Sequence, residues 1–317
     1  MIVALAGGVG GAKMAQGLAL ALPPGELTVV VNTADDFDLY GLRICPDLDT
    51  VLYTLAGLAN PSTGWGIAGD TRHALDAIAR LGRDPWFLLG DQDLATHILR
   101  TERLRAGATL TAVTAEFASA LGISSAILPM TDDPVSTLIK TPEGDLDFQE
   151  YFVRRHQQDE VTGVIFRGAD QARASEAAMA AIATAELIVI CPSNPIVSIG
   201  PILAVPGFRE ALLQTDAPRI AVSPIIGGRA LKGPADRMLA TLGHDVSAAG
   251  VAALYEGMLD GFVIDEQDRP LADPIRAAGV RVLATQTIMG DAADRRRLAG
   301  EVLAFGRSLA RAGVAAS

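Results

Sequence analysis

The hydrophobic pattern of the chain predicts short buried strands that alternate with helices, beginning at the first residues. Residues 2–6 form an apolar run that stops at a glycine turn, Gly7-Gly8-Val9-Gly10-Gly11, and an Ala/Leu-rich helical pattern extends from Ala12 to about Leu22. Residues 27–31 form a second apolar run, rich in β-branched side chains. Continuous apolar runs of this length are typical of parallel strands that are buried on both faces.

The same pattern returns in the second half of the chain. Apolar runs and helical spacing there predict further strands and helices, namely strands at residues 161–166, 187–190, 219–222 and 260–265 and helices at 174–185 and 291–312. Strands that alternate with helices in this way indicate an α/β fold. We therefore expect a Rossmann-like parallel sheet with helices on both faces.

The region between these two halves has a different pattern. It contains helical patterns separated by polar turns and one hairpin, with helices at residues 68–81, 93–103 and 111–121 and hairpin arms at 136–141 and 146–153. We expect a single domain over residues 1–317. Within it, residues 1–57 and 160–317 form the Rossmann-like core and residues 58–159 form a mostly helical insertion.

Composition and charge narrow the class of protein. The chain has 317 residues, of which 50% are hydrophobic and 20% are charged, and its formal net charge is −11. A chain of this size and composition easily buries a hydrophobic core. Its negative charge repels nucleic acid, so a phosphate ligand has to be held locally by glycine amides, a few cations or a metal.

Other features exclude several further classes. No apolar run reaches the roughly 18 residues that a membrane-spanning helix needs, and no signal peptide precedes the first strand, so we expect a cytoplasmic protein without a membrane partner. Cys45 and Cys191 are the only cysteines. Their separation indicates neither a disulfide framework nor a cysteine metal site.

The glycine turn after the first strand predicts a phosphate site. Glycines at a strand-to-helix junction allow positive φ and let a ligand approach the amides of the helix N-terminus, although a tight turn alone also explains them. Lys13 occupies the position of the third glycine of the dinucleotide fingerprint, and no Walker A sequence follows. Asn32 stands where a dehydrogenase needs a carboxylate for the ribose, so an NAD oxidoreductase is disfavoured.

Polar and acidic loops follow the other predicted strands. They contain paired carboxylates or neutral donors, at Asp35-Asp36, Asp47 and Asp49, Asp132-Asp133, Ser193-Asn194-Pro195 and residues 223–228. Because the carboxyl ends of parallel strands meet at one edge, we expect these loops to converge on the glycine turn. Glycine amides and Lys13 suit phosphates, and carboxylates suit Mg²⁺. Together they indicate transfer of a phosphoryl-type group from a nucleotide diphosphate.

Several of these residues also have a purely structural interpretation. We expect either Asp47 or Asp49 to cap the helix that follows, and we interpret Asp93 as an N-cap. The pair at 132–133 would, on its own, be a solvated acidic turn. For His97 both interpretations stay open, because polar residues crowd the loop and helix start in which it lies.

A series of ordered blocks resembles the 2-phospho-L-lactate transferase (CofD/FbiA) family. The blocks run from Ile2 through at least Gly228 and are GGVGGAK, VVVNTADD, CPDLDTVLY, WGIAGDT, LGDQDLATH, LPMTDDPVST, FQEYFV, CPSNPIVSIGPIL and VSPIIGG. The resemblance implies a single catalytic domain that acts in coenzyme F420 biosynthesis. Such enzymes move a phospholactyl or phosphoenolpyruvyl group from a guanosine diphosphate conjugate to the 5′-hydroxyl of the deazaflavin Fo. They release GMP and use magnesium.

The resemblance also implies roles for individual residues. The guanosine diphosphate portion is expected to contact Gly8, Val9, Gly10, Gly11, Lys13, Asn32, Ser193, Asn194, Pro195 and Gly227. The Fo pocket is expected to contain Asp49, Asp91, Thr96 and His97. Asp49 is the expected catalytic residue, which orients the Fo hydroxyl or binds magnesium. The expected Mg²⁺ ligands are Asp49, Asp36 and Asp132.

Some questions stay open in the sequence. A non-catalytic nucleotide-sugar-binding regulator of the gluconeogenesis-factor type is the alternative, although the WGIAGDT, LGDQDLATH and FQEYFV blocks favour the transferase. The sequence does not distinguish phospholactyl, phosphoenolpyruvyl and phosphoglyceryl donors. Leu88 stands where some archaeal relatives have a lysine, so a contact by that lysine is not expected. A homodimer is expected from the resemblance alone.

Overall fold

A seven-stranded parallel sheet organises the computed structural model, which describes residues 1–314. The strand order is β14-β13-β10-β9-β1-β2-β5, and each neighbouring pair is parallel. The strands are β1 (Ile2–Ala6), β2 (Leu27–Val31), β5 (Ala126–Pro129), β9 (Leu187–Ile190), β10 (Arg219–Val222), β13 (Gly261–Asp265) and β14 (Arg281–Thr285). The chain order reverses between β1 and β9, which is the position where open parallel sheets bind ligands.

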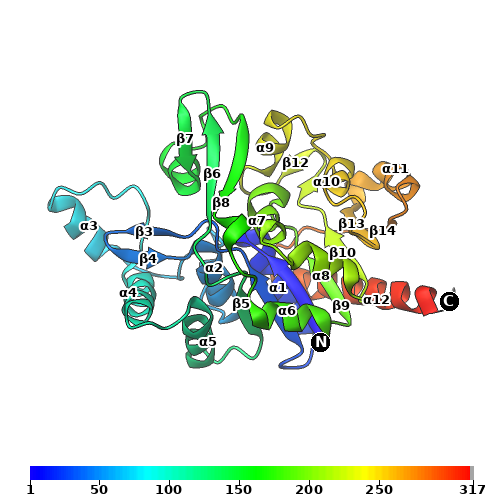
Figure 1. The fold of residues 1–317 in the computed structure, drawn as a ribbon, viewed down its shortest axis with the longest axis horizontal. Coiled ribbons are helices and arrows are strands. Elements are labelled where there is room, and N and C mark those ends of the chain that lie inside the picture. Colours follow the sequence, from blue (N-terminus) through cyan, green and yellow to red (C-terminus); the bar gives the residue numbers. More distant parts are fainter. Residues whose placement is uncertain (315–317) are drawn as a thin grey trace.

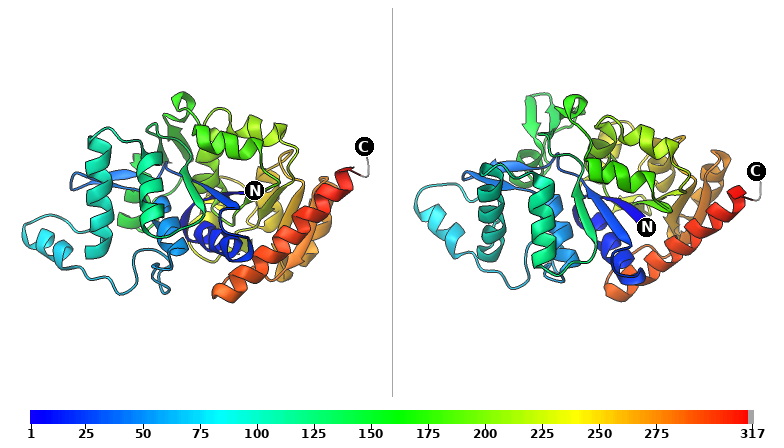
Figure 2. Two further views of the ribbon diagram at one scale, coloured as in Figure 1. Left: turned by 90° about the horizontal axis from the view of Figure 1, so that it is seen from below. Right: turned by 60° about the horizontal axis from the view of Figure 1, so that its bottom comes forward.

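Helices cover both faces of this sheet (Figures 1 and 2). Along β1, Val3 and Leu5 belong to one hydrophobic core, whereas Ile2, Ala4 and Ala6 belong to the other. The second core contains residues of α1 (Gly8–Ala21), α2 (Pro46–Leu55), α5 (Leu110–Ala120) and α12 (Ala292–Val314). The first contains residues of α6 (Glu176–Ala183), α7 (Gly200–Ala204), α8 (Phe208–Gln214), α9 (Ala235–Thr241), α10 (Ala248–Leu254) and α11 (Ala272–Ala277).

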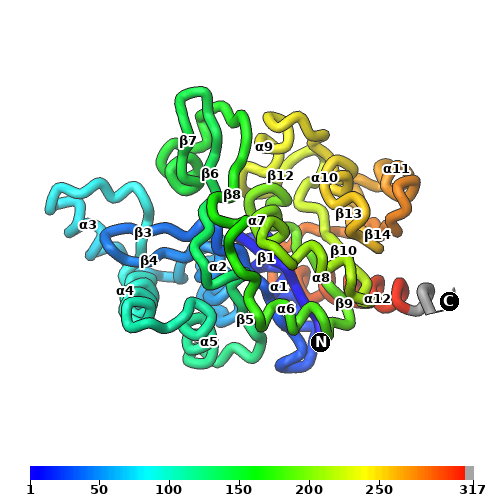
Figure 3. The backbone as a smooth tube through the Cα atoms, viewed as in Figure 1, coloured from blue at the N-terminus to red at the C-terminus, as the bar shows by residue number. Residues whose placement is uncertain are grey.

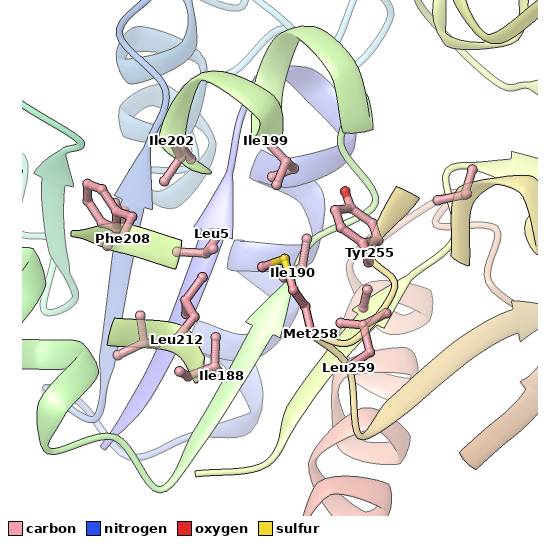
Figure 4. Close-up of a cluster of buried hydrophobic side chains, with 14 of the residues drawn as sticks. Leu5, Ile188, Ile190, Ile199, Ile202, Phe208, Leu212, Tyr255, Met258 and Leu259 are labelled. Carbon is pink, nitrogen blue, oxygen red and sulfur yellow. The ribbon is translucent and has the colours of Figure 1, made fainter. Parts of the chain in front are cut away.

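Figure 4 shows part of the first core, in which Leu5 and Ile188 lie beside Leu212, and Ile190 lies beside Met258. These side chains are essentially inaccessible to solvent. Their burial explains the continuous apolar runs of the sequence, because each central strand packs against helices on both sides. The predicted Rossmann-like α/β fold is confirmed.

Three small antiparallel sheets each follow the carboxyl end of a main strand. The hairpin β3 (Phe37–Leu39)–β4 (Leu42–Ile44) follows β2. A three-stranded sheet of β7 (Gly144–Asp147), β6 (Ser136–Thr141) and β8 (Gly163–Arg167) follows β5. The pair β11 (Ile225–Ile226)–β12 (Arg229–Ala230) follows β10. The tube in Figure 3 shows the β3–β4 and β6–β8 segments extending away from the main sheet.

The sheet membership of two segments differs from the prediction. Residues 163–167 do not rejoin the main sheet, because β8 pairs antiparallel with β6. All five β8 residues are partly or fully exposed, so an apolar run did not mean burial on two faces there. Conversely, β5 lies within the range assigned to a mostly helical insertion, yet it pairs with β2 at the edge of the main sheet. β14 was not predicted.

Most helix predictions in the middle region hold with shifted ends. α4 (Asp91–Arg105) and α5 match the predicted segments, whereas α3 covers only His73–Arg80 of the predicted 68–81. Gly69 has a φ of +69°, which is not helical, so the helix cannot begin at residue 68 as predicted. The first hairpin arm is confirmed, but the second ends at Asp147 because residues 150–154 form a π-helical turn.

Among the described residues, no single helix has the length and apolar composition needed to cross a membrane. One helix pair, bent by 86° between Pro195–Ala204 and Phe208–Gln214, meets these two criteria together.

Candidate active site

The glycine turn is fixed against the loop that follows β9. The Gly7 N–H donates to Ser193 Oγ at 3.1 Å, and the Ser193 hydroxyl donates to the Gly7 carbonyl at 2.8 Å. A Cβ on Gly10 would lie 2.2 Å from the Pro192 carbonyl oxygen. The glycine at position 10 is therefore required by the close approach of the β9 loop, at the point where the strand order reverses.

α1 begins directly at this turn and leaves its N-terminus available for an anion. Its first turn contains no acidic residue, and its N-cap, Gly7, has no side chain to cap it. Gly8 adopts a φ of +61° and its N–H donates to Asp47 Oδ1 at 2.8 Å. The turn thus combines the positive end of a 14-residue helix with the left-handed backbone that Gly8 allows, and both are typical of phosphate sites.

Asp47 links the glycine turn to the loop after β2. Asn32 Nδ2 donates to Asp47 Oδ2 at 3.0 Å, and Asn32 Oδ1 accepts from the Ala34 N–H at 2.9 Å. Burial raises the pKa of Asp47 to about 6, against hydrogen bonds from Asn32 and Gly8 that lower it. Asn32 is fully buried, so its observed role is to orient Asp47.

Two further carboxyl groups in the β2 loop are buried and have oxygens without a hydrogen-bond partner. Asp36 has a side chain that is 1% exposed, and neither of its oxygens has a partner; the same holds for Oδ1 of Asp35. Burial raises the pKa of Asp36 to about 7, although Arg43, whose guanidinium lies 3.8 Å away, opposes the shift. Burial and the charge of Asp47 raise the pKa of Asp35. Buried oxygens without donors need either a proton or a cation.

α2 and α4 bring together a second group of buried ionisable side chains. Arg100 binds both carboxylate oxygens of Asp49, with 3.0 Å between Arg100 Nη1 and Asp49 Oδ2. His97 lies between two carboxylates: its Nδ1 is 3.6 Å from Asp49 Oδ2, and its Nε2 is 3.3 Å from Asp93 Oδ1. The Tyr53 hydroxyl donates to Asp93 Oδ1 at 2.7 Å. All five side chains are buried.

Helical spacing explains why these side chains meet. Asp93, His97 and Arg100 are separated by four and three residues on α4, which places them on one face of the helix. Asp49 and Tyr53 are likewise four residues apart on α2. Sequence reasoning missed Arg100 and Tyr53, although this spacing, on a face that also carries Leu94 and Thr101, was a usable signal.

The charges of this network compensate one another. Burial lowers the pKa of Arg100, but the neighbouring Asp49 charge raises it above its ordinary value. Burial acts to raise the pKa of Asp93, but His97 and the Tyr53 hydroxyl hold it below the ordinary value. Arg100 and Asp49 therefore form a charged pair inside the protein.

Asp49, Asp93 and His97 also form a candidate metal group. Within residues 1–314 they offer ligand atoms that lie within 4.8 Å of one another. However, the Arg100 guanidinium already binds both oxygens of Asp49 and lies 3.3 Å from His97 Nδ1. An arginine cation thus neutralises this group, and a site that includes histidine suits Mg²⁺ poorly, because Mg²⁺ prefers oxygen ligands.

The three predicted Mg²⁺ ligands do not form one cluster. Asp36 and Asp132 line the same cavity, of about 470 Å³, together with Arg43 and Arg173. The oxygens of Asp132 accept from the Thr111 N–H at 2.7 Å and from the Thr111 hydroxyl at 3.0 Å, at the start of α5. Asp132 thus has the contacts of a helix cap, whereas the oxygens of Asp36 have no hydrogen-bond partner and only the Arg43 guanidinium at 3.8 Å.

Two expected helix caps are wrong. The N-cap of α2 is Cys45 and that of α4 is Gly90, and neither helix has a side-chain cap bond. Asp47 and Asp49 accept hydrogen bonds from Gly8 and Arg100 instead. At the start of α4, the N–H of Asp93 donates to Asp70 Oδ2 at 3.0 Å, so a carboxylate from an earlier loop accepts a hydrogen bond from the first turn of this helix.

Asp91 and Thr96, both predicted for the Fo pocket, lie around the start of α4. Asp91 Oδ2 accepts from the His73 N–H at 3.0 Å, and Oδ1 accepts from the Ala74 N–H at 2.9 Å. These contacts tie Asp91 to the first turn of α3. Thr96 is partly exposed and precedes the buried His97.

The loops after β9 and β10 lie at the same edge of the sheet, as predicted. Asn194 Oδ1 accepts from the Ile196 N–H at 2.9 Å, which fixes the turn that begins at Pro195. The Gly227 N–H donates to Asp268 at 3.1 Å. Lys13 reaches across from α1, and its Nζ donates to the Met289 carbonyl at 2.9 Å.

The chain is similar to known proteins over almost its whole length. The sequence model of the family described as 2-phospho-L-lactate transferase CofD matches residues 2–296. A phosphoenolpyruvate transferase from Streptomyces coelicolor is 43% identical over 317 aligned residues, which cover 98% of this chain and 99% of the relative. A 2-phospho-L-lactate transferase from Methanosarcina acetivorans is 42% identical over 298 residues, covering 94% and 96%.

Among solved structures, a UPF0052 family member from Bacillus halodurans superposes with a TM-score of 0.64 and 16% identity, over 95% of this chain and 98% of that one. At this identity the likeness shows the fold alone. The family match extends over nearly the whole sequence, and relatives at 42–43% identity cover almost all of it. The chain therefore belongs to the 2-phospho-L-lactate transferase CofD family.

Proposed function

We propose that this protein transfers a phospholactyl or phosphoenolpyruvyl group from a guanosine diphosphate conjugate to the 5′-hydroxyl of Fo, with release of GMP, in coenzyme F420 biosynthesis. The names of its relatives, which divide between the two transferases at 43% and 42% identity, support this reaction class. The observation that carries the proposal is the meeting of the glycine turn with buried carboxylates at one sheet edge. Asp47 joins the two directly, through the Gly8 N–H.

In this proposal the donor diphosphate lies at the N-terminus of α1. The amides of Val9 to Gly11 and the Lys13 amine bind it, while the Gly8 N–H stays on Asp47, and the loops at 193–195 and 227 hold the rest of the guanosine diphosphate. Backbone amides and a helix N-terminus stabilise phosphate charge without side-chain reorganisation. The network around Asp49 then faces the acceptor.

Asp49 orients the Fo hydroxyl for attack on phosphorus. Arg100, bonded to both Asp49 oxygens, holds this carboxylate in one orientation. His97 Nδ1, 3.6 Å from Asp49 Oδ2, is placed to take the proton that the hydroxyl loses. Because phosphoryl-type transfer passes through a loose transition state, neither group needs to be a strong base, and positioning supplies most of the rate.

Magnesium is the proposed cofactor. The residues fit it, since both oxygens of Asp36 and Oδ1 of Asp35 are buried without a hydrogen-bond partner and oxygen is the ligand that Mg²⁺ prefers. Of the three predicted ligands, Asp36 has the strongest support, because Asp49 is paired with Arg100 and Asp132 with Thr111. When bound, the metal would neutralise diphosphate charge and stabilise the leaving GMP.

The proposal is tested by mixing the purified protein with Fo and a guanylated phospholactate, phosphoenolpyruvate or phosphoglycerate donor, with magnesium or with chelator. We expect Fo-dependent and magnesium-dependent GMP release with at least one donor, and the fastest donor identifies the three-carbon acid. Absence of GMP with every donor would favour the non-catalytic regulator. Size-exclusion chromatography with light scattering tests the expected homodimer.

A further inference from the structure

A loop from the middle of the chain packs directly on the glycine turn. Residues 60–66 form a tight loop in which the Gly64 N–H donates to the Asn60 carbonyl at 2.8 Å and the Asn60 N–H donates to the Gly66 carbonyl at 3.0 Å. Gly64 has a φ of +81°, and a Cβ there would lie 2.5 Å from Cγ1 of Val9. The loop backbone therefore touches the central residue of the glycine turn.

Lys232 reaches this contact from another part of the chain. It lies between β12 and α9, in the segment that follows the β10 loop, and its Nζ donates to the Thr63 carbonyl at 2.7 Å. The same Nζ is 3.5 Å from the position that a Cβ on Gly64 would occupy. A flexible ammonium group is thus held beside Val9 by a single neutral carbonyl.

Lysine is rare in this chain, and Lys232 lies close to another lysine at the glycine turn. The chain has three lysines, Lys13, Lys140 and Lys232. Lys13 and Lys232 both lie near the glycine turn. In the part of the chain that the structure describes, neither Lys13 nor Lys232 pairs with a carboxylate, and each donates to a backbone carbonyl instead. Burial, then Arg295 and Lys232, lower the pKa of Lys13, so these cations repel one another.

An anion bound between Lys13 and Lys232 would relieve the repulsion that the partly buried Lys13 experiences from its neighbouring cations. The protein as a whole carries a net charge of −11, so a local excess of positive charge is contrary to its general composition. A lysine ammonium is a compact point charge with three donors on a flexible stem, and it binds phosphate oxygens without demanding one geometry.

We propose that Lys232 is a second phosphate-binding lysine of the donor site. Its Nζ donates to the Thr63 carbonyl when the site is empty and to a phosphate oxygen when the donor is bound. This inference rests on the proposed function, since it takes the glycine turn as the donor cradle. Two ammonium groups at one cradle attract a diphosphate more strongly than a monophosphate. Lys232 therefore favours the diphosphate donor over the product GMP and promotes product release.

Calorimetric titration with GDP and with GMP tests this role without any need for turnover. We expect Lys232→Met to raise the Kd for GDP about tenfold, which corresponds to about 1.4 kcal/mol, and to raise the Kd for GMP less. Lys140→Met is the matched control, because Lys140 is exposed on β6 and should leave both values unchanged. Lys232→Arg should retain part of the GDP affinity, and high salt should narrow the gap between wild type and Lys232→Met.

The outcomes separate this inference from the proposed function. If wild type binds GDP and Lys232→Met binds it within twofold of Lys140→Met, the role of Lys232 is refuted while the donor cradle stands. Equal weakening of GDP and GMP would refute the preference for diphosphate. If wild type binds no GDP, the donor cradle and the role of Lys232 both fail. Thermal unfolding checks that the variants fold, as the exposure of Lys232 leads us to expect.

Discussion

Replacing Arg100 with methionine is expected to destabilise the fold by leaving a buried charge unpaired. Arg100 is 2% exposed and Asp49 is 5% exposed, and the guanidinium binds both carboxylate oxygens. Methionine retains an apolar stem but removes the counter-charge of Asp49. Loss of one partner of a buried pair costs about 3–5 kcal/mol, which is a large part of the roughly 5–15 kcal/mol that stabilises a typical domain.

Urea unfolding near neutral pH, followed by circular dichroism, measures this cost in a double-mutant cycle. We expect Arg100→Met and Asp49→Asn each to lower the free energy of unfolding, and the double variant to lose less than the sum of the two. The double variant contains no unpaired buried charge, so the coupling should be about 2 kcal/mol or more. Arg103→Met is the control, because its ion pair with Glu116 is about half exposed and should contribute little.

Additive effects of the two single variants would contradict this reasoning, as would an Arg100→Met variant no less stable than Arg103→Met. Either result would mean that the carboxylate of Asp49 does not depend on Arg100. The group formed with Asp93 and His97 would then be free to hold a metal, and the interpretation of Arg100 as its resident cation would be wrong.

Three further predictions address the donor site, the acidic loop and the turn. Lys13→Met should raise the KM for the guanylyl donor about tenfold with little change in kcat, because its phosphate contact persists from ground state to transition state; an unchanged KM in GMP-release kinetics would exclude that contact. The folded-state pKa of Asp36 is about 7 against an ordinary 3.8, so with metal chelated its ionisation should lower stability as the pH rises from about 4 to about 7. Asp36→Asn should reduce this loss by the part that Asp36 contributes, while Asp35 and Asp47, whose pKa values are also raised, keep theirs; parallel wild-type and variant stability curves over that range would refute it. Gly10→Ala should lower the free energy of unfolding by about 1–3 kcal/mol, because its Cβ would lie 2.2 Å from the Pro192 carbonyl oxygen. Gly300→Ala, with open space around its Cβ, should raise the free energy of unfolding by up to about 1 kcal/mol in α12. Similar urea midpoints for the two variants would contradict the clash.

The central sheet was predictable because its middle strands are buried on both faces. β1, β2 and β9 show no exposed residue. In the sequence β1 and β9 are continuous apolar runs and β2 is a near-continuous one, interrupted only by Thr28. β14 escaped prediction because it lies at the sheet edge, where its residues are partly or fully exposed. The β8 segment has a similar composition to a core strand, and only its pairing with β6 assigns it to another sheet.

The ionisable network was less predictable, since its contacts join residues far apart in the chain. Asp49 was found from its place at a predicted helix start, but its partner Arg100 is 51 positions away. Asp93 was interpreted as an N-cap from its position near the start of a helix. The N–H of Asp93 instead donates to Asp70, 23 positions earlier, which frees the Asp93 carboxylate to accept from Tyr53.

Single-turnover release of GMP, with Fo, magnesium and a guanylated donor, tests the role of Asp49 most directly. Asp49→Asn should slow release by on the order of 10² to 10⁴, because it removes a charged acceptor at the attacking hydroxyl. Asp38→Asn, at a side chain that is 74% exposed, should release GMP at the wild-type rate. A rate for Asp49→Asn equal to that of Asp38→Asn would contradict the assignment of Asp49 to the reaction.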